Sequence, residues 1–266
     1  MQNIDANGCR FRVRIDGKEN GPWIVLAHGL ATDLSMWDDL VAALRNRFRI
    51  LRYDARGHGS SSATPGAYSW DMLVSDAVAL QDQVGIERAH FVGLSMGGMV
   101  GLGLAIHHRA RILSLSACDA RAEATPEYNE GWTERVRIVR AGGMDALVER
   151  TLRRWFTPAF LATPSERLDK MRAMMRATSV DGYCGCAAAL QTLHYAPHLP
   201  NLKVPALYVV GAEDLGAPPE VVRTMHDATP GSQFIEIPNA GHISAVENTS
   251  DFNDAIAEFI DRVAKA

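Results

Sequence analysis

The sequence has 266 residues, 47% of them apolar and 22% charged, with a formal net charge of −4. This length and composition allow one large core, so one domain with an insertion is expected. The acidic balance disfavours a nucleic-acid partner, and the apolar runs are far shorter than the roughly 20 residues of a membrane span.

The predicted elements begin with a half-exposed strand at residues 9–15, where Arg alternates with apolar residues. Asp16-Gly17 indicates a turn behind it, and antiparallel pairing is expected at this end. Short β-branched or aliphatic runs then predict buried strands, at residues 23–27, 49–53, 89–94, 112–117, 206–210 and 234–237. Apolar residues recurring at three and four predict helices, at residues 72–84, 96–107, 220–228 and 252–263. This alternation predicts an α/β fold with a mostly parallel sheet covered on both faces.

The rhythm breaks between residues 119 and 199, where prolines separate segments of helical spacing that are rich in Arg, Met and Ala. We therefore predict a helical cap insertion at residues 120–199 and a core made of residues 1–119 and 200–266.

Targeting and cysteine signals favour a cytoplasmic protein. The first residues lack the charged and apolar order of a secretory signal. The Cys184-x-Cys186 spacing suits neither a disulfide nor a typical zinc site. We expect all four cysteines to be reduced and mostly buried: Cys9, Cys118, Cys184 and Cys186.

The strongest motif is Gly93-Leu94-Ser95-Met96-Gly97, which follows an apolar strand and opens a helix. It fits the G-x-S-x-G nucleophile elbow, a sharp strand-to-helix turn that exposes a serine hydroxyl. Side chains two residues either side of the serine would collide in such a turn, which explains the glycines. A helix entry capped by serine, with no catalytic role, is the alternative.

A serine nucleophile needs an acid and then a histidine downstream, each just after a strand. One strand runs into Asp214 and the next into His242, so the order Ser, Asp, His is satisfied. Glu213 competes for the acid role, and Asp214 is preferred. A solvated loop residue is the alternative interpretation of His242.

Acyl transfer also needs N–H donors aimed at the developing oxyanion. The backbone N–H of Met96, directly after the nucleophile, is one candidate. The other is the N–H of Leu30, in the loop His28-Gly29-Leu30 after an early strand, where His28 would brace the loop.

Other chemistry finds little support in the sequence. The glycine-rich segment 54–60 is expected to be a tight turn braced by Asp54 and Arg56. Without HExxH or comparable spacing, no metal site is predicted. The run from Gly93 to Gly98 lacks the GxGxxG order of a dinucleotide site, so no cofactor is expected.

Together these motifs resemble the α/β-hydrolase superfamily, from His28-Gly29-Leu30 through the Asp54 turn and the Ser95 elbow to Gly241-His242. Within it, three segments are similar to the 3-oxoadipate enol-lactone hydrolases of aromatic catabolism: residues 154–157, 177–178 and 182–189. The resemblance implies the α/β-hydrolase fold, the same triad and oxyanion N–H groups, no cofactor, and a small enol-lactone substrate that carries a carboxylate.

A carboxylate substrate would need a cation, and Arg121, Arg135 or Arg154 would supply one if it faces the pocket. An exposed Glu123 would repel such a substrate. Five apolar residues would either line a pocket or pack the cap on the sheet: Trp132, Trp155, Phe156, Met174 and Met175.

The predicted reaction is attack by Ser95 on an ester or lactone carbonyl, proton transfer to His242, and hydrolysis of an acyl-enzyme. A general carboxylesterase, a cofactor-free perhydrolase and a carbon–carbon bond hydrolase are the enzymatic alternatives. A small-molecule receptor on a hydrolase scaffold is the alternative outside enzymes. The sequence leaves the oligomeric state open.

Overall fold

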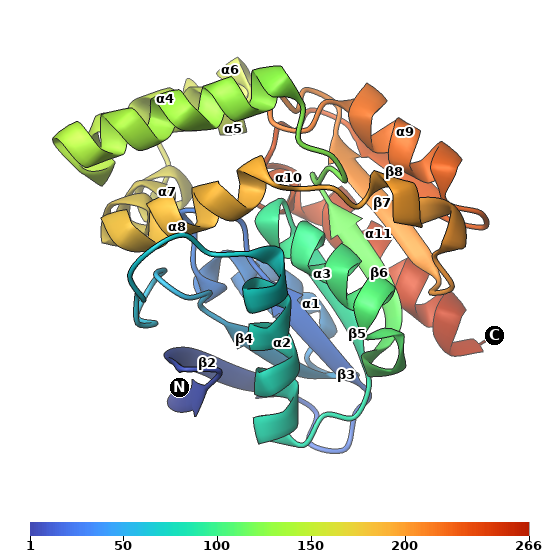
Figure 1. Ribbon diagram of the computed structural model, residues 1–266. Coiled ribbons are helices and arrows are strands. Elements are labelled where there is room, and N and C mark those ends of the chain that lie inside the picture. Colours follow the sequence, from blue (N-terminus) through green and yellow to red (C-terminus); the bar gives the residue numbers. More distant parts are fainter. Residues whose placement is uncertain (266) are drawn as a thin grey trace.

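The computed structural model describes residues 1–265 and is built on one eight-stranded sheet (Figure 1). The strand order is β1-β2-β4-β3-β5-β6-β7-β8. The β1/β2 and β2/β4 pairs are antiparallel and the others are parallel, which confirms the predicted start and sheet type. The strands are β1 (Gln2–Ala6), β2 (Cys9–Gly17), β3 (Trp23–Ala27), β4 (Arg49–Tyr53), β5 (Ala89–Leu94), β6 (Ile112–Cys118), β7 (Ala206–Gly211) and β8 (Gln233–Ile237).

Helices cover both faces of this sheet, with α2 and α3 on one face and α1 and α11 on the other (Figure 1). The α-helices are α1 (Asp38–Leu44), α2 (Trp70–Val84), α3 (Met96–His107), α4 (Pro126–Gly142), α5 (Val148–Trp155), α6 (Pro158–Leu161), α7 (Glu166–Ala177), α8 (Val180–Gln191), α9 (Pro219–Ala228), α10 (Ser244–Glu247) and α11 (Thr249–Lys265). Short 3₁₀ helices are η1 (Leu34–Trp37), η2 (Arg109–Arg111), η3 (Met144–Leu147) and η4 (Ala196–Asn201).

A hairpin at the start of the chain was missed by the sequence analysis. Asn7 and Gly8 join β1 to β2 with φ angles of 44° and 69°. Two successive left-handed residues are typical of a type I′ turn, for which Asn-Gly is a strong signal. The Asn7 side chain also donates a hydrogen bond to Asp76 of α2 at 2.7 Å, which fastens the hairpin to the helix.

Residues 120–199, called here the helical segment, hold α4 to α8, which lie together over one end of the sheet (Figure 1). The two ends of the segment lie side by side. The carbonyl of Ala122 accepts a hydrogen bond from the N–H of Tyr195 at 2.7 Å, and the N–H of Ala124 donates to Leu193 at 2.9 Å. The segment therefore leaves the sheet after β6 and returns before β7 through one paired neck.

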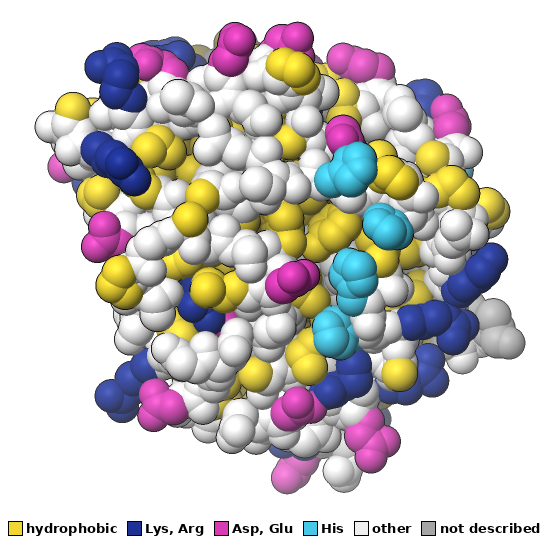
Figure 2. Space-filling model, in the orientation of Figure 1, with side chains coloured by type: hydrophobic (Ala, Val, Ile, Leu, Met, Phe, Trp, Pro, Cys, Tyr) yellow, Lys and Arg dark blue, Asp and Glu magenta, His cyan; other side chains and the backbone are white. Residues whose placement is uncertain are grey.

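The surface carries both signs of charge, since acidic and basic side chains are both scattered over the face seen in Figure 2. Within residues 1–265, none of the helices has the length and apolarity to cross a bilayer. The described cysteines are all free thiols, and three of the four are buried.

Buried histidines should make the fold sensitive to acid. Burial lowers the pKa of His90 from its ordinary value near 6.5 to about 4, and that of His58 to about 3. The unfolded chain binds these protons near pH 6.5 and the folded chain does not, so stability present above that pH is lost as the pH falls toward 4. The loss approaches about 1.4 kcal/mol per pH unit for each group.

Thermal unfolding between about pH 7 and pH 4.5 tests this expectation. His90→Asn keeps a polar partner for Ser114 Oγ, which lies 2.8 Å from Nδ1 of His90, but removes the titration. The melting temperature of the variant should therefore fall less steeply with acid than that of the wild type. Equal slopes would show that His90 does not contribute.

Candidate active site

Ser95 lies in the sharp turn between β5 and α3 with a φ of 52° and a ψ of −115°, outside the regions that non-glycine residues prefer. A Cβ added at Gly93 would lie 2.2 Å from the carbonyl oxygen of Gly97. One added at Gly97 would lie 2.1 Å from the carbonyl oxygen of Ala27, at the end of β3. Only glycine fits at both positions, and the turn has the strand-to-helix geometry that the motif predicts.

The structure brings together the three residues that the sequence selected. His242 Nε2 lies 2.9 Å from Ser95 Oγ, and His242 Nδ1 lies 2.9 Å from each carboxylate oxygen of Asp214. They come from the loops after β5, β7 and β8, and both His242 and Asp214 are buried. A carboxylate at Nδ1 favours the tautomer with its proton there, which leaves Nε2 free to accept the serine proton.

Contacts in the loop after β7 distinguish Asp214 from its neighbour Glu213. The Asp214 carboxylate accepts backbone hydrogen bonds from Gly216 at 2.5 Å and Ala217 at 3.0 Å. Glu213 is exposed, and its carboxylate makes no hydrogen bond within the described residues. A Cβ added at Gly216 would lie 2.6 Å from His242 Nδ1, so the loop passes directly against the imidazole.

Two backbone N–H groups are available beside the nucleophile. A Cβ added at Gly29 would lie 3.6 Å from the Cβ of Ser95, which places this loop against the elbow. The next N–H, that of Leu30, donates to no group within residues 1–265. Met96 is the first residue of α3, where helical N–H groups have no partner inside the helix. Both N–H groups that the sequence analysis named are therefore free to donate to a ligand.

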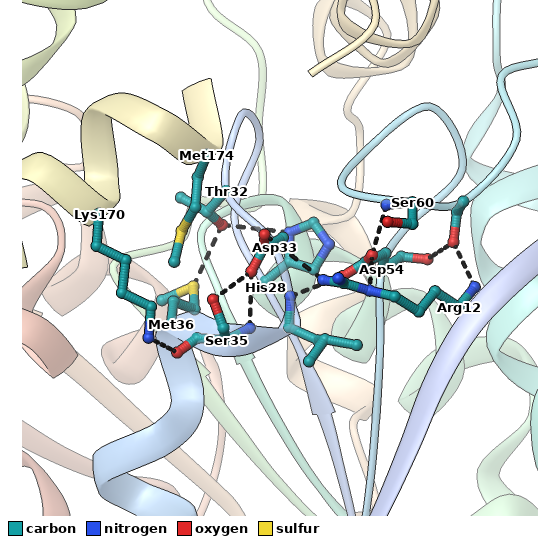
Figure 3. Close-up of polar contacts among 12 residues, drawn as sticks. Arg12, His28, Thr32, Asp33, Ser35, Met36, Asp54, Ser60, Lys170 and Met174 are labelled. Carbon is teal, nitrogen blue, oxygen red and sulfur yellow. Dashed lines mark hydrogen bonds and ion pairs between the residues drawn. The ribbon is translucent and has the colours of Figure 1, made fainter. Parts of the chain in front are cut away.

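The loop that carries Leu30 is held by polar side chains (Figure 3). His28 Nε2 accepts from the N–H of Ala55 at 2.8 Å, which leaves the proton on Nδ1 to donate to the carbonyl of Gly29 at 2.7 Å. Thr32 Oγ1 donates to the same carbonyl at 2.8 Å. These bonds fix the peptide that precedes the Leu30 N–H, so His28 braces the loop as predicted.

The tight turn at residues 54–60 is braced by Asp54 and Arg56, both within the turn and through partners outside it. Inside the turn, the Asp54 carboxylate accepts from the N–H of Ser60 at 2.8 Å. The Asp54 carboxylate binds Arg12 Nε at 2.6 Å and accepts from the N–H of Leu34 at 2.9 Å (Figure 3). Arg56 pairs with Asp76 of α2. The turn therefore links β2, the loop after β3 and α2.

A cavity of about 350 Å³ lies between the sheet and the helical segment, bordered by Ser95 and His242. Of the predicted apolar wall, Trp132 and Trp155 line it. The other three are buried and do not border it: Phe156, Met174 and Met175. The sequence analysis missed two further aromatic residues of this wall, Tyr128 and Tyr183.

The three predicted arginines separate in the structure. Arg135 and Arg154 line the cavity, whereas Arg121 lies behind Tyr128 with its Cζ 4.1 Å from the ring centroid. Glu123 was expected to repel an anion, and this was wrong because it lies outside the cavity and pairs with His194 at 2.7 Å.

The cavity wall is positively charged. Arg135 and Arg154 form no salt bridge or side-chain hydrogen bond within the described part of the chain. Burial lowers the pKa of both guanidiniums, and Arg154 lowers that of Arg135 further. Arg150 and Arg153, which the sequence analysis did not name, also line the cavity and are exposed. Half-buried guanidiniums without partners are suited to bind a carboxylate through paired hydrogen bonds.

The helical segment also contacts the loop that carries His242. The carbonyl of Trp155 accepts from the N–H of Ile243 at 3.3 Å and would lie 2.5 Å from a Cβ added at Gly241. Glu247 bridges the same two parts, accepting from the N–H of Thr157 at 2.9 Å and from that of Gly241 at 2.8 Å. We call these contacts the Trp155–Glu247 seam.

Comparison with known proteins agrees with this geometry. Residues 22–249 match the model of the alpha/beta hydrolase fold family. The chain belongs to this family. The α/β hydrolase is 32% identical to 3-oxoadipate enol-lactonase 2 of Acinetobacter baylyi, over 98% of this chain and 95% of that protein.

Two solved structures are similar to this α/β hydrolase over nearly their whole length. The enol-lactonase of Burkholderia xenovorans has a TM-score of 0.94 and 39% identity, covering 98% of this chain and 100% of that one. A thermophilic esterase from Thermogutta terrifontis, with malate bound, has a TM-score of 0.93 and 29% identity, covering 99% of each chain. The predicted fold and the resemblance to enol-lactone hydrolases are thus confirmed.

Proposed function

We propose that this protein hydrolyses a small ester or lactone that carries a carboxylate, with an enol-lactone of the 3-oxoadipate type as its preferred substrate. One observation carries the proposal: the hydrogen-bonded Ser95, His242 and Asp214 border a cavity whose wall holds the unpaired guanidiniums of Arg135 and Arg154. The names of the similar enol-lactonases support the substrate, and malate, bound to the similar esterase, is itself a carboxylate.

In the proposed mechanism Ser95 Oγ attacks the substrate carbonyl while His242 Nε2 takes the serine proton. The N–H groups of Leu30 and Met96 donate to the oxyanion that forms. As the intermediate collapses, His242 returns the proton to the departing oxygen. In a lactone that oxygen stays attached to the acyl group, and in an enol-lactone it becomes the hydroxyl of an enol. Water activated by His242 then releases the acid and restores the serine.

Different segments of the chain have different roles in this proposal. We propose that residues 120–199 form a cap that determines the substrate, because the cavity-lining arginines Arg135 and Arg154 both lie on it. Residues 1–119 and 200–266 form the core that carries the reacting groups. The paired neck at Ala122 and Tyr195 supports an insertion between β6 and β7.

Steady-state kinetics on three substrates test the proposal: 3-oxoadipate enol-lactone, its methyl ester and p-nitrophenyl acetate. The free acid should have the highest kcat/KM. Arg154→Gln should lower kcat/KM for the free acid by about 10- to 100-fold, the usual cost of one lost charge-assisted contact, and leave p-nitrophenyl acetate nearly unchanged.

Arg137→Gln is the control for Arg154→Gln, because Arg137 lies on the same helical segment but outside the cavity, is exposed and pairs with Glu134 at 2.8 Å. It should leave all three rates unchanged. Equal rates on the acid and its methyl ester would refute carboxylate recognition and favour a general carboxylesterase.

A further inference from the structure

One buried carboxyl beside the triad has no part in the mechanism above. Asp119 directly follows β6, is 0% exposed and has a φ of 49°, a left-handed conformation that is uncommon for residues other than glycine. It also borders the cavity. A buried polar side chain in a strained conformation persists only where its contacts hold it, so the contacts of Asp119 indicate its role.

The two oxygens of Asp119 bind the last residue of β7 and the first residue of α10, which border the loops that carry Asp214 and His242. Oδ1 accepts from the N–H of Gly211 at 2.8 Å, three residues before Asp214. Oδ2 accepts from Ser244 Oγ at 2.6 Å, two residues after His242. One side chain therefore connects the loop that carries the acid with the loop that carries the base.

The backbone at the same point holds the third member of the triad. The carbonyl of Cys118 accepts from the N–H of Ser95 at 2.7 Å, and the N–H of Asp119 donates to Val209 of β7 at 2.8 Å. The end of β6 is thus hydrogen-bonded to the nucleophile, to β7 and to the segment after His242.

The charge state of Asp119 follows from its surroundings. Burial, and then the negative charge of nearby Asp214, raise the pKa of Asp119 well above its usual range. Both effects favour the protonated form of Asp119 over the charged one.

We propose that Asp119 is a positioning residue which, through these hydrogen bonds, holds the Asp214 and His242 loops in register with Ser95. This inference rests on the proposed function. Asp119 itself exchanges no proton with the substrate. Its amide counterpart, Asn, has the same shape. The amide Oδ1 can accept from the N–H of Gly211 and the amide Nδ2 can donate to Ser244 Oγ, so Asn should perform the same role.

The test compares Asp119→Asn with Asp119→Ala, using p-nitrophenyl acetate. Asp119→Ala should lower kcat by about 10- to 100-fold with little change in KM, because small displacements of catalytic groups cost that much. Asp119→Asn should keep kcat within about threefold and leave the acid limb of the kcat/KM pH profile unmoved. Ser114→Ala is the control, since it breaks a buried hydrogen bond at the opposite end of β6 and should alter only stability.

Ser244→Ala provides a second test that does not depend on the folding of Asp119→Ala. Ser244→Ala should lower kcat less than Asp119→Ala does. The double variant should be no slower than Asp119→Ala alone, because both single variants remove the same hydrogen bond between Ser244 and Asp119. Effects that multiply would overturn the proposed tie, and so would full kcat in Asp119→Ala. An acid limb shifted by Asp119→Asn would show that Asp119 acts on His242 through its charge, which contradicts a role in positioning alone. Wild-type activity that survives Ser95→Ala would instead refute the proposed function.

Discussion

Ser95→Ala is expected to lower kcat/KM by about 10⁴-fold or more on both p-nitrophenyl acetate and the enol-lactone. The alanine leaves no oxygen that can form the acyl-enzyme, while the oxyanion N–H groups and the cavity remain. A fluorophosphonate should label the wild type at one residue and leave the variant unlabelled.

The control for this variant is Ser116→Ala. Ser116 is a buried serine of β6 whose hydroxyl has no hydrogen-bond partner among the described residues, so its loss should leave activity intact. Both variants should unfold cooperatively. If Ser95→Ala turned over substrate at more than a few per cent of the wild-type rate, with labelling still present, the nucleophile would have to lie elsewhere.

Asp214→Asn is expected to lower kcat by about 10³- to 10⁴-fold. The carboxylate accepts the Nδ1 proton of His242, whereas an amide can present an N–H to that nitrogen instead. The imidazole then carries its proton on Nε2 and cannot accept one from Ser95.

Glu213→Gln is the matched control, one residue away. Its carboxyl is exposed, so its loss should change kcat by no more than about twofold. The reverse ranking of the two variants would assign the orienting acid to Glu213. Equal and small effects would remove the carboxylate from the mechanism.

The sequence predicted most strands and helices because each forms one buried run or one periodic face. The parallel strands β3 and β5 are almost entirely apolar and buried, and their predicted bounds are confirmed. The first strand was missed because β1 contains one large apolar residue, Ile4, and therefore shows no alternation. Its turn signal, Asn7-Gly8, was present in the sequence.

The residues of the candidate site also differ in how well the sequence predicts them. The reacting groups were predictable because the α/β-hydrolase fold fixes their order along the chain and places each after a strand. The pocket wall was not, because helical spacing indicates which residues share a face but not what that face covers. Arg121 and Arg154 look alike in sequence, yet only Arg154 borders the cavity. Asp119 escaped notice because its role depends on contacts with residues more than ninety positions away.

The Trp155–Glu247 seam limits how such proteins can be recombined. A helical segment transplanted from a relative would bring its own pocket wall, but it would also replace the carbonyl that packs on Gly241 and the N–H that binds Glu247. A graft that ends before Trp155 retains these contacts with the His242 loop. One that crosses the seam must place its own backbone carbonyl and N–H against the retained Gly241 and Glu247, so new specificity is most readily engineered upstream of residue 155.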